Sequence, residues 1–340
     1  MKKAIVTGIT GQDAAYLAKL LLSKNYKVYG TYKKENDLSF WRLQELGVED
    51  HPHLELLEYD LLDLDATMDM FKSLKPDEVY NLAAQSHVPK SFEAPIETVG
   101  ATGLGVLHIL EAIRYVDTNI KLFQASSSEI FGKTHIYPQT EETKFYPRNP
   151  YGVSKAFAHM MSINYRETYG IFACIGILYN HESPLRGEAF VTRKITSSVA
   201  KIKLGQLDVL KLGNLDAKRD WGYAQEYAQA MYLMMQEEVP QTYILATNRV
   251  QTVRDFVIMA FKAVDIELEF RGSDENEFAI DLKTRKVVLE VNPIFYRPLE
   301  KELLIGNPKK IQERLGWQAK TSLEEICKIM LKADLERCLR

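Results

Sequence analysis

The first half of the chain alternates short apolar-rich runs with longer segments in which apolar residues recur at helical spacing, as in the leucines of residues 17–22. Short apolar runs are typical of buried parallel strands, whereas a 3.6-residue period is typical of amphipathic helices. The alternation predicts a doubly wound α/β domain, whose ligands bind beyond the carboxyl ends of the strands. The expected strands are Lys3–Thr7, Lys27–Tyr32, Leu54–Glu58, Glu78–Asn81 and Lys121–Ala125.

The pattern becomes irregular from about residue 180, where polar loops separate shorter elements. We therefore predict a first domain over residues 1–178 and a smaller, interleaved α/β substrate-binding lobe over most of residues 179–340. The chain is expected to return to the first sheet near residues 207–212 and 242–246.

Composition excludes several classes of protein. A net charge of −3 over 340 residues gives no general attraction to nucleic acid. No apolar stretch approaches membrane-spanning length, and the N-terminus lacks the pattern of a signal peptide, so we expect no membrane association. Three cysteines, far apart in sequence, favour reduced thiols and a cytoplasmic protein. His51 and His53 have metal-like spacing but no further support, so no metal site is predicted.

A glycine turn follows the first expected strand and precedes a helix. Glycines in such a turn let the backbone approach a pyrophosphate, and the helix N-terminus favours its negative charge. The sequence therefore predicts a Rossmann-type dinucleotide site. Its expected cofactor-binding residues are Gly8, Ile9, Thr10, Gly11, Gln12 and Asp13.

A second motif places Tyr151 at the head of a helix and Lys155 one turn later, on the same helix face. This spacing is common on ordinary amphipathic helices. Here, however, the Tyr–Lys pair follows a phosphate-binding turn and a serine-rich strand end at residues 126–128. In that context the pair predicts an enzyme that transfers hydride. The lysine charge, with that of a nicotinamide, lowers the pKa of the phenol so that it can act as a base.

Several longer strings are more specific than either motif. These strings are Gln124–Glu129, Phe145–Arg148, Asn180–Pro184, Phe190–Ile195, Gly213–Gly222 and Tyr296–Pro298. On them, and over essentially its whole length, the chain resembles the GDP-mannose 4,6-dehydratase family of extended short-chain dehydrogenases/reductases.

The resemblance implies a reaction and four catalytic residues. GDP-mannose, or a related GDP-sugar, would be oxidised at C4, lose water across C5–C6 and be reduced at C6. Tyr151, assisted by Lys155, would take the C4 hydroxyl proton, and Ser127 would hold that oxygen. Glu129 would remove the C5 proton and help water to leave. The family usually has threonine where Ser127 stands, and serine keeps the hydroxyl.

The cofactor preference is predicted at the second strand. An NAD enzyme usually carries an acidic residue there, whereas Lys33 and Lys34 favour the 2′-phosphate of NADP over NAD. The resemblance also implies a role for Arg42, a basic position that in the family reaches the cofactor of a neighbouring subunit. The other expected cofactor contacts are Asp60, Leu61, Leu82, Ala83, Ala84, Gln85, Ser86, Lys155, His181 and Arg186.

The substrate's two phosphates and guanine need cations and polar groups. The resemblance implies that Lys194, Arg219 and Arg297 are the cations. Asn180 and Glu300 are the expected polar contacts. Arg193 could instead be structural or intersubunit. The resemblance further implies a homodimer or homotetramer, with the loop of residues 33–42 as a candidate interface.

The chain departs from the family on the cofactor side, at Ala14, Ala15, Glu97, Gly100 and Thr102. These departures leave a GDP-heptose or another GDP-hexose open as the substrate. A sugar-nucleotide 4-epimerase, decarboxylase or reductase is a second interpretation. A catalytically inactive nucleotide-sugar binder or NADP sensor is a third, which the intact set of four catalytic residues disfavours.

Overall fold

The computed structural model describes residues 1–34, 39–295 and 303–339. These residues form two compact units. Unit 1 consists of Met1–Tyr179, Ala224–Ala246 and Gly306–Gln318. Unit 2 consists of Asn180–Tyr223, Thr247–Ile305 and Ala319–Arg340. Residues 242–246 were expected to return to the first domain, whereas residues 224–241 and 306–318 of unit 1 were expected in the second lobe.

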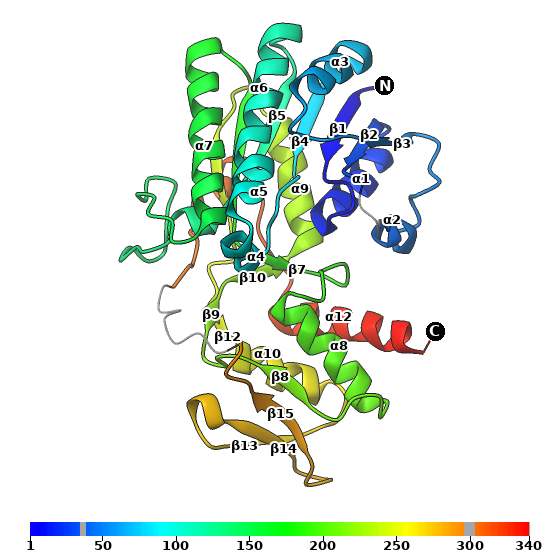
Figure 1. Cartoon of the computed structure of the whole chain (residues 1–340), viewed down its shortest axis with the longest axis vertical. Coiled ribbons are helices and arrows are strands. Elements are labelled where there is room, and N and C mark those ends of the chain that lie inside the picture. Colours follow the sequence, from blue (N-terminus) through cyan, green and yellow to red (C-terminus); the bar gives the residue numbers. More distant parts are fainter. Residues whose placement is uncertain (35–38, 296–302, 340) are drawn as a thin grey trace. The chain divides into compact units, whose positions relative to one another are not determined.

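The centre of unit 1 is a parallel sheet of seven strands, in the order β11-β6-β5-β4-β1-β2-β3 (Figure 1). The direction of winding reverses beside β1, which is where such sheets bind ligands. The predicted doubly wound Rossmann-type fold is confirmed. The strands are β1 (Lys3–Thr7), β2 (Lys27–Tyr32), β3 (Leu54–Glu58), β4 (Glu78–Asn81), β5 (Lys121–Ser127), β6 (Ala173–Leu178) and β11 (Thr242–Leu245).

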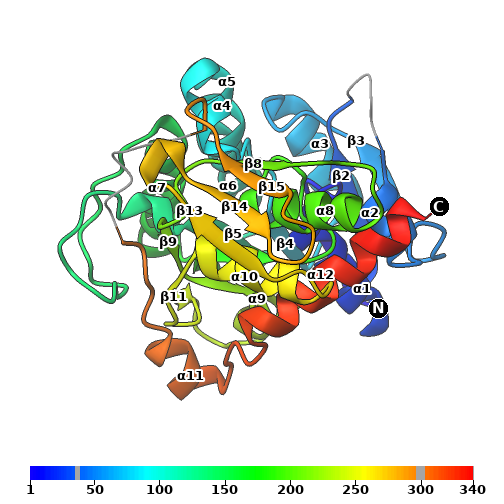
Figure 2. The ribbon, with the colours of Figure 1, turned by 90° about the horizontal axis from the view of Figure 1, so that it is seen from below.

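Helices cover both faces of this sheet (Figures 1 and 2). On one face α3 (Leu64–Leu74), α6 (Gly105–Val116) and α7 (Pro150–Tyr169) enclose a core with the strands. On the other face α1 (Gln12–Ser23) and α9 (Ala224–Met235) lie side by side. Shorter helices of unit 1 are α2 (Trp41–Glu45), α4 (Val88–Glu93), α5 (Pro95–Val99), the π-helical η1 (Gly100–Leu104), the 3₁₀ turn η2 (Ser128–Ile130) and α11 (Lys309–Leu315).

The expectation that no apolar stretch approaches membrane-spanning length is wrong for one helical segment of unit 1. This segment, Pro95–Val116, consists of α5, η1 and α6, and its 22 residues are long and apolar enough to cross a membrane by length and composition. More than half of the apolar window is buried inside the protein, and Ile109, Leu110 and Ile113 belong to the core. A helix buried in an α/β core is apolar on most sides, so the observation is weak support for a membrane span.

Unit 2 has its own sheet and core. Its sheet has the order β13-β14-β15-β8, and its core joins this sheet to α8, α10 and α12 (Figure 2). Two short pairs, β7 with β10 and β9 with β12, complete it. The elements are β7 (Asn180–Glu182), α8 (Val191–Lys203), β8 (Leu210–Leu212), β9 (Lys218–Arg219), β10 (Trp221–Tyr223), β12 (Gln251–Thr252), α10 (Val253–Lys262), β13 (Leu268–Arg271), η3 (Asp274–Asn276), β14 (Phe278–Asp281), β15 (Val287–Val291) and α12 (Leu323–Cys338).

The prediction that residues 207–212 return to the first sheet is wrong. β8 pairs with β15 in unit 2 instead. Leu210 and Leu212 are buried while Lys211 between them is exposed. Such alternation suits a sheet with one solvated face, whereas the central strands of the first sheet are buried on both faces. β11, near the second predicted return, pairs with β6 in the first sheet.

Candidate active site

The glycine turn of unit 1 has the shape that a phosphate cradle needs. Gly8 has φ +69°, and a Cβ there would lie 2.9 Å from Cα of Ala83, so only glycine fits this turn without strain. The N–H of Gly11 donates to the carbonyl of Gly8 at 2.9 Å, which closes the turn. Gly11 is also the N-cap of α1 and offers no capping side chain. A pyrophosphate therefore fits at this helix N-terminus.

Buried polar side chains link the strand ends beneath this turn. The Thr7 hydroxyl donates to Oδ1 of Asn81 at 2.7 Å and accepts from the N–H groups of Leu82 and Ala83, both at 3.0 Å. Nδ2 of Asn81 then donates to Oε1 of Gln124 at 2.8 Å. These bonds hold the carboxyl ends of β1, β4 and β5 in register, where the predicted ribose and nicotinamide contacts follow.

Lys155 extends from α7 to the same strand end. Its Nζ donates to the carbonyl of Ala125 at 2.8 Å, and its side chain is only 3% exposed. Burial lowers the pKa of Lys155 to about 8, while the Asp13 carboxylate opposes this shift. Nζ lies 5.8 Å from the ring centroid of Tyr151, which is 9% exposed. The predicted Tyr–Lys pair therefore shares the inward face of α7.

The buried lysine makes stability depend on pH. Because its folded pKa lies below the ordinary lysine pKa of 10.5, the unfolded chain binds more protons between about pH 8 and 10.5, and stability rises with pH in this window. Lys155→Met removes this contribution, and the Ala125 carbonyl keeps a donor in Nε2 of Gln124 at 2.9 Å. In urea unfolding of cofactor-free protein, the stability of the variant relative to wild type should fall by about 2 kcal/mol from pH 7 to pH 10. A pH-independent difference would contradict the assigned burial.

The remaining two predicted catalytic residues lie at the end of β5. The Ser127 hydroxyl accepts from the N–H of Glu129 at 3.2 Å, at the start of η2. The Glu129 carboxylate in turn accepts from Nδ2 of Asn149, the residue before α7, at 2.7 Å. The first turn of α7 packs closely here, since a Cβ on Gly152 would lie 2.7 Å from the Glu129 carbonyl oxygen. Unit 1 thus brings Ser127, Glu129, Tyr151 and Lys155 together at β5, η2 and the first turns of α7.

Two residues of this site did not emerge from the sequence analysis. Asn149 could have been found, because asparagine before a proline is a common signal for the start of a helix. His159 lies one turn beyond Lys155, and its Nδ1 contacts Oγ of Ser126 at 3.0 Å. Burial lowers the pKa of His159 to about 4, so that it is neutral at pH 7. Only the tertiary contact with Ser126 reveals its place in the site.

The lysines expected at the 2′-phosphate lie near acidic side chains. Nζ of Lys33 is 3.4 Å from Asp60, and Nζ of Lys34 is 3.9 Å from Glu58. Both lysine side chains are mostly exposed and thus accessible to a ligand. Arg42 donates to the carbonyl of Thr10 at 2.7 Å, so it braces the glycine turn of its own chain.

The other predicted contacts of unit 1 differ in accessibility. Leu61 is buried, residues 82–85 are partly buried and Ser86 is exposed. The Gln85 side chain accepts from the N–H of His87 at 2.8 Å and donates to Thr98 at 3.2 Å. These bonds order the loop after β4.

In unit 2, predicted cofactor and substrate residues lie on β7 and the loop after it. Asn180 and His181 pair with Trp221 and Gly222 of β10, so two of the family strings lie side by side. Nε of Arg186 is 3.2 Å from Glu182, and its guanidinium lies 3.6 Å from the ring centroid of Phe190. His181 is buried.

The predicted phosphate-binding cations of unit 2 lie on α8 and β9. Nζ of Lys194 lies 3.7 Å from the ring centroid of Phe295, and burial lowers its pKa. Gly213 approaches the same segment, since a Cβ there would lie 2.1 Å from the Phe295 carbonyl oxygen. Arg219 pairs with Gln251 across β9 and β12. Arg297 and Glu300 lie outside the described residues.

Arg193 has a structural position in unit 2. Its Nε donates to both carboxylate oxygens of Asp334 at 2.8 and 3.0 Å, and Nη1 donates to the carbonyls of Pro184 and Arg186. The side chain is buried. Arg193 therefore ties α8 to α12 and to the loop after β7, which agrees with the structural alternative.

Known proteins resemble the chain over nearly its whole length. The profile of the family described as GDP-mannose 4,6 dehydratase matches residues 5–330. A GDP-mannose 4,6-dehydratase of Yersinia enterocolitica is 44% identical over 352 residues, covering 99% of this chain and 95% of that protein.

Two solved structures share the fold. RMD from Pseudomonas aeruginosa, complexed with NADPH, has a TM-score of 0.78 at 22% identity, covering 99% of this chain and 100% of that chain. DesIV, a dTDP-glucose 4,6-dehydratase from Streptomyces venezuelae with NAD and TYD bound, has a TM-score of 0.82 at 17% identity, covering 98% and 97%. These two structures share the fold alone, whereas the profile match and the identity to the Yersinia enzyme show that the chain belongs to the GDP-mannose 4,6-dehydratase family.

Proposed function

We propose that this chain is a lyase that converts GDP-mannose to GDP-4-keto-6-deoxy-mannose. Membership of the family supports this function. The observation that carries the proposal is the grouping of Ser127, Glu129, Tyr151 and Lys155 at the end of β5 and the start of α7, with the Glu129 carboxylate fixed there by Asn149.

The tyrosine and serine serve the first step in this proposal. The nicotinamide, when bound, supplies the hydride acceptor for C4 and the hydride donor for C6. Tyr151 takes the proton of the C4 hydroxyl, and the nearby Lys155 ammonium favours the ionised phenol. Ser127 binds the C4 oxygen through its hydroxyl. The proton held by Tyr151 can later be delivered to C5, which restores the phenolate.

Glu129 serves the elimination. A ketone at C4 makes the C5 proton acidic, and the Glu129 carboxylate can then remove it. The same proton protonates the C6 hydroxyl, which leaves as water, so that Glu129 returns to its ionised form. A simple 4-epimerase needs no acid or base at C5. Glu129 is therefore the residue that favours the dehydratase over the epimerase.

The glycine turn and the buried Lys155 fit a nicotinamide dinucleotide, and two proteins of this fold bind NADPH or NAD. We propose NADP as the cofactor, because Lys33 and Lys34 follow β2 where NAD enzymes usually carry an acid. Replacing both lysines by alanine should weaken NADP binding about tenfold or more and leave NAD binding nearly unchanged. Calorimetric titration of the cofactor-free protein measures both constants. Equal losses for the two cofactors would contradict the preference.

The substrate can be tested with the protein alone. Incubation with GDP-mannose, without added cofactor, should remove one water from the sugar nucleotide, as followed by mass spectrometry. Loss of water from a GDP-heptose but not from GDP-mannose would keep the chemistry and change the substrate. No product from either, even with NADP added, would favour the epimerase, reductase or inactive-binder interpretations. We propose that the residues that bind the GDP-sugar are Asn180, Lys194, Arg219, Arg297 and Glu300.

We also propose a homodimer or homotetramer. On α7 the apolar side chains of Val153, Phe157 and Met160 are exposed at helical spacing, and Val99 at the end of α5 is exposed as well. Such a stripe is typical of a surface covered by another chain. The other candidate interface, residues 33–42, includes residues 35–38, which lie outside the described part. Light scattering of the purified protein gives the number of subunits, and a monomer at micromolar concentration would contradict the proposal.

A further inference from the structure

The Asn149 side chain makes two hydrogen bonds in different directions. Its Oδ1 accepts from the backbone N–H of Gly152 at 2.7 Å and so caps α7. Its Nδ2 donates to Oε2 of Glu129 at 2.7 Å. The first bond fixes the orientation of the amide, because only its oxygen can accept from a backbone N–H. The group that faces the carboxylate is therefore a donor.

This one residue links the two parts of the proposed machinery. Tyr151 lies two residues after Asn149, in the first turn of α7, and Lys155 lies in the next turn. The close approach of Gly152 to the Glu129 backbone holds η2 against that turn. Asn149 thus ties the Glu129 carboxylate to the start of the helix that carries the Tyr151 phenol.

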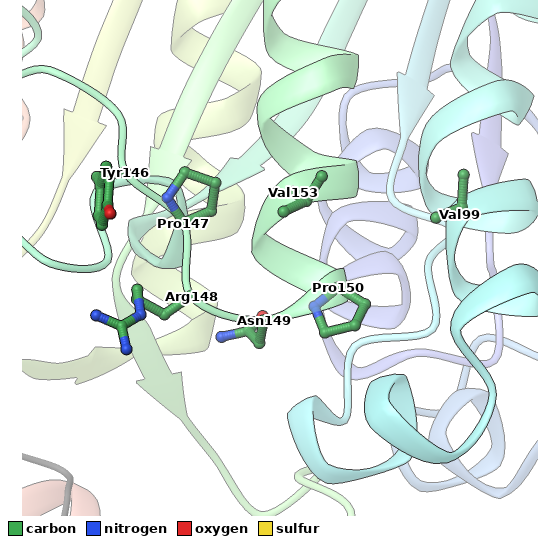
Figure 3. Close-up of a pocket in the computed structure, with 7 residues that line it drawn as sticks. All are labelled: Val99, Tyr146, Pro147, Arg148, Asn149, Pro150 and Val153. Atoms are coloured by element: carbon green, nitrogen blue, oxygen red, sulfur yellow. The ribbon is translucent and has the colours of Figure 1, made fainter.

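The surroundings strengthen the contact. Asn149 is 8% exposed, and it lines an open pocket of about 530 Å³ together with Val99, Arg148, Pro150 and Val153 (Figure 3). The bond to Glu129 is partly buried, and partial shielding from water makes a hydrogen bond electrostatically stronger than one in bulk solvent. A neutral N–H donor also favours the ionised form of a carboxylate without adding a charge.

We infer that Asn149 is a positioning residue for the elimination step, which keeps Glu129 ionised and aimed at the substrate. This inference rests on the proposed function for the role of Glu129. Asparagine, aspartate and serine cap helices about equally well. Serine, however, has one short hydroxyl for both contacts, and aspartate has no N–H and would bring a second negative charge beside Glu129. All three residues can therefore cap the helix, but only asparagine also has an N–H group that donates to Glu129.

The test uses Asn149→Ser and Asn149→Asp in the full chain. Both keep a capping oxygen for Gly152, so Tm should stay close to that of wild type. Ionisation of Tyr151 also contributes to the acid limb of the kcat profile, but the part that reports Glu129 should move to higher pH, by about one unit or more in Asn149→Asp. At the wild-type acid limb, kcat should fall about tenfold, while KM changes little. The other titratable groups described at the site are Tyr151, Lys155 and His159, and the charged Arg148 lines the same pocket. Both variants leave these groups in place.

Two further measurements separate a change in Glu129 ionisation from a general loss of stability as the cause of a lower kcat. Ser322→Ala removes the cap of α12 in unit 2, where Ser322 accepts from the N–H of Glu325 at 3.2 Å. It should lower Tm without moving the acid limb. Carbon-13 NMR titration of labelled glutamate, assigned with Glu129→Gln, reads the Glu129 pKa without any turnover. In both Asn149 variants this pKa should rise.

The NMR titration also separates failure of this inference from failure of the proposed function. If wild type converts no GDP-sugar, the function is wrong, yet a raised Glu129 pKa in the variants still supports the link to Asn149. An unchanged Glu129 titration with an unchanged acid limb would overturn the inference. So would a lower kcat with neither of these shifts, since Asn149 would then only support the local fold.

Discussion

Tyr151→Phe should lower kcat for loss of water from GDP-mannose by about a thousandfold. The variant keeps the ring and its packing on the inward face of α7, where Tyr151 is largely buried, but removes the hydroxyl that takes the C4 proton. C4 oxidation begins the reaction, so every later step stops with it. Cofactor binding should be unchanged, because Lys155 keeps its bond to Ala125. Single-turnover kinetics with saturating GDP-mannose measures the loss.

Tyr165→Phe is the matched control for this variant. Tyr165 is a buried tyrosine on the same helix, and its hydroxyl donates to Glu111 at 2.5 Å, away from the proposed site. Its loss should cost about 1 kcal/mol of stability and leave kcat near that of wild type. Wild-type turnover in Tyr151→Phe, with GDP-sugar still bound, would show that another group is the base.

Glu129→Gln should stop the reaction one step later. Glutamine keeps the size of the side chain and an oxygen that can accept from Asn149, but it cannot take a proton from C5. We expect kcat for water loss to fall by about a hundredfold to ten-thousandfold. Oxidation at C4 should continue, so the absorbance of reduced nicotinamide should build up when GDP-mannose is added. Stopped-flow absorbance and mass spectrometry on one sample follow both events.

The two variants predict opposite absorbance records. Tyr151→Phe should show neither reduced cofactor nor product, whereas Glu129→Gln should show reduced cofactor without product. A Glu129→Gln variant that loses water at the wild-type rate would remove Glu129 from the elimination and favour the epimerase or reductase interpretation of the site.

The strands of unit 1 could be predicted because their sequence pattern is local. Four of the five predicted strands, such as Lys27–Tyr32, have the predicted bounds. The fifth, predicted as Lys121–Ala125, begins as predicted and ends two residues later, at Ser127. Most of these short strands are buried and leave a clear apolar signal, and a glycine turn marks the end of Lys3–Thr7. The Leu210–Leu212 strand was placed in the wrong sheet, because three residues do not specify their neighbour.

The site could be predicted only as far as its motifs extend. Tyr151 and Lys155 are joined by helical spacing, which the sequence contains. The contacts of Glu129 with Asn149 and of Ser126 with His159 join separate elements, so no local pattern encodes them. The same is true of Thr7, which organises the strand ends from within a buried network.

The most direct measurement uses GDP-mannose that carries deuterium at C4. If the proposed sequence of oxidation, elimination and reduction is right, each molecule that loses water carries the deuterium at C6 of the product, without added cofactor. Mass spectrometry and NMR locate the label. Water loss with deuterium released to solvent, or label retained at C4 with no loss of water, would contradict the account.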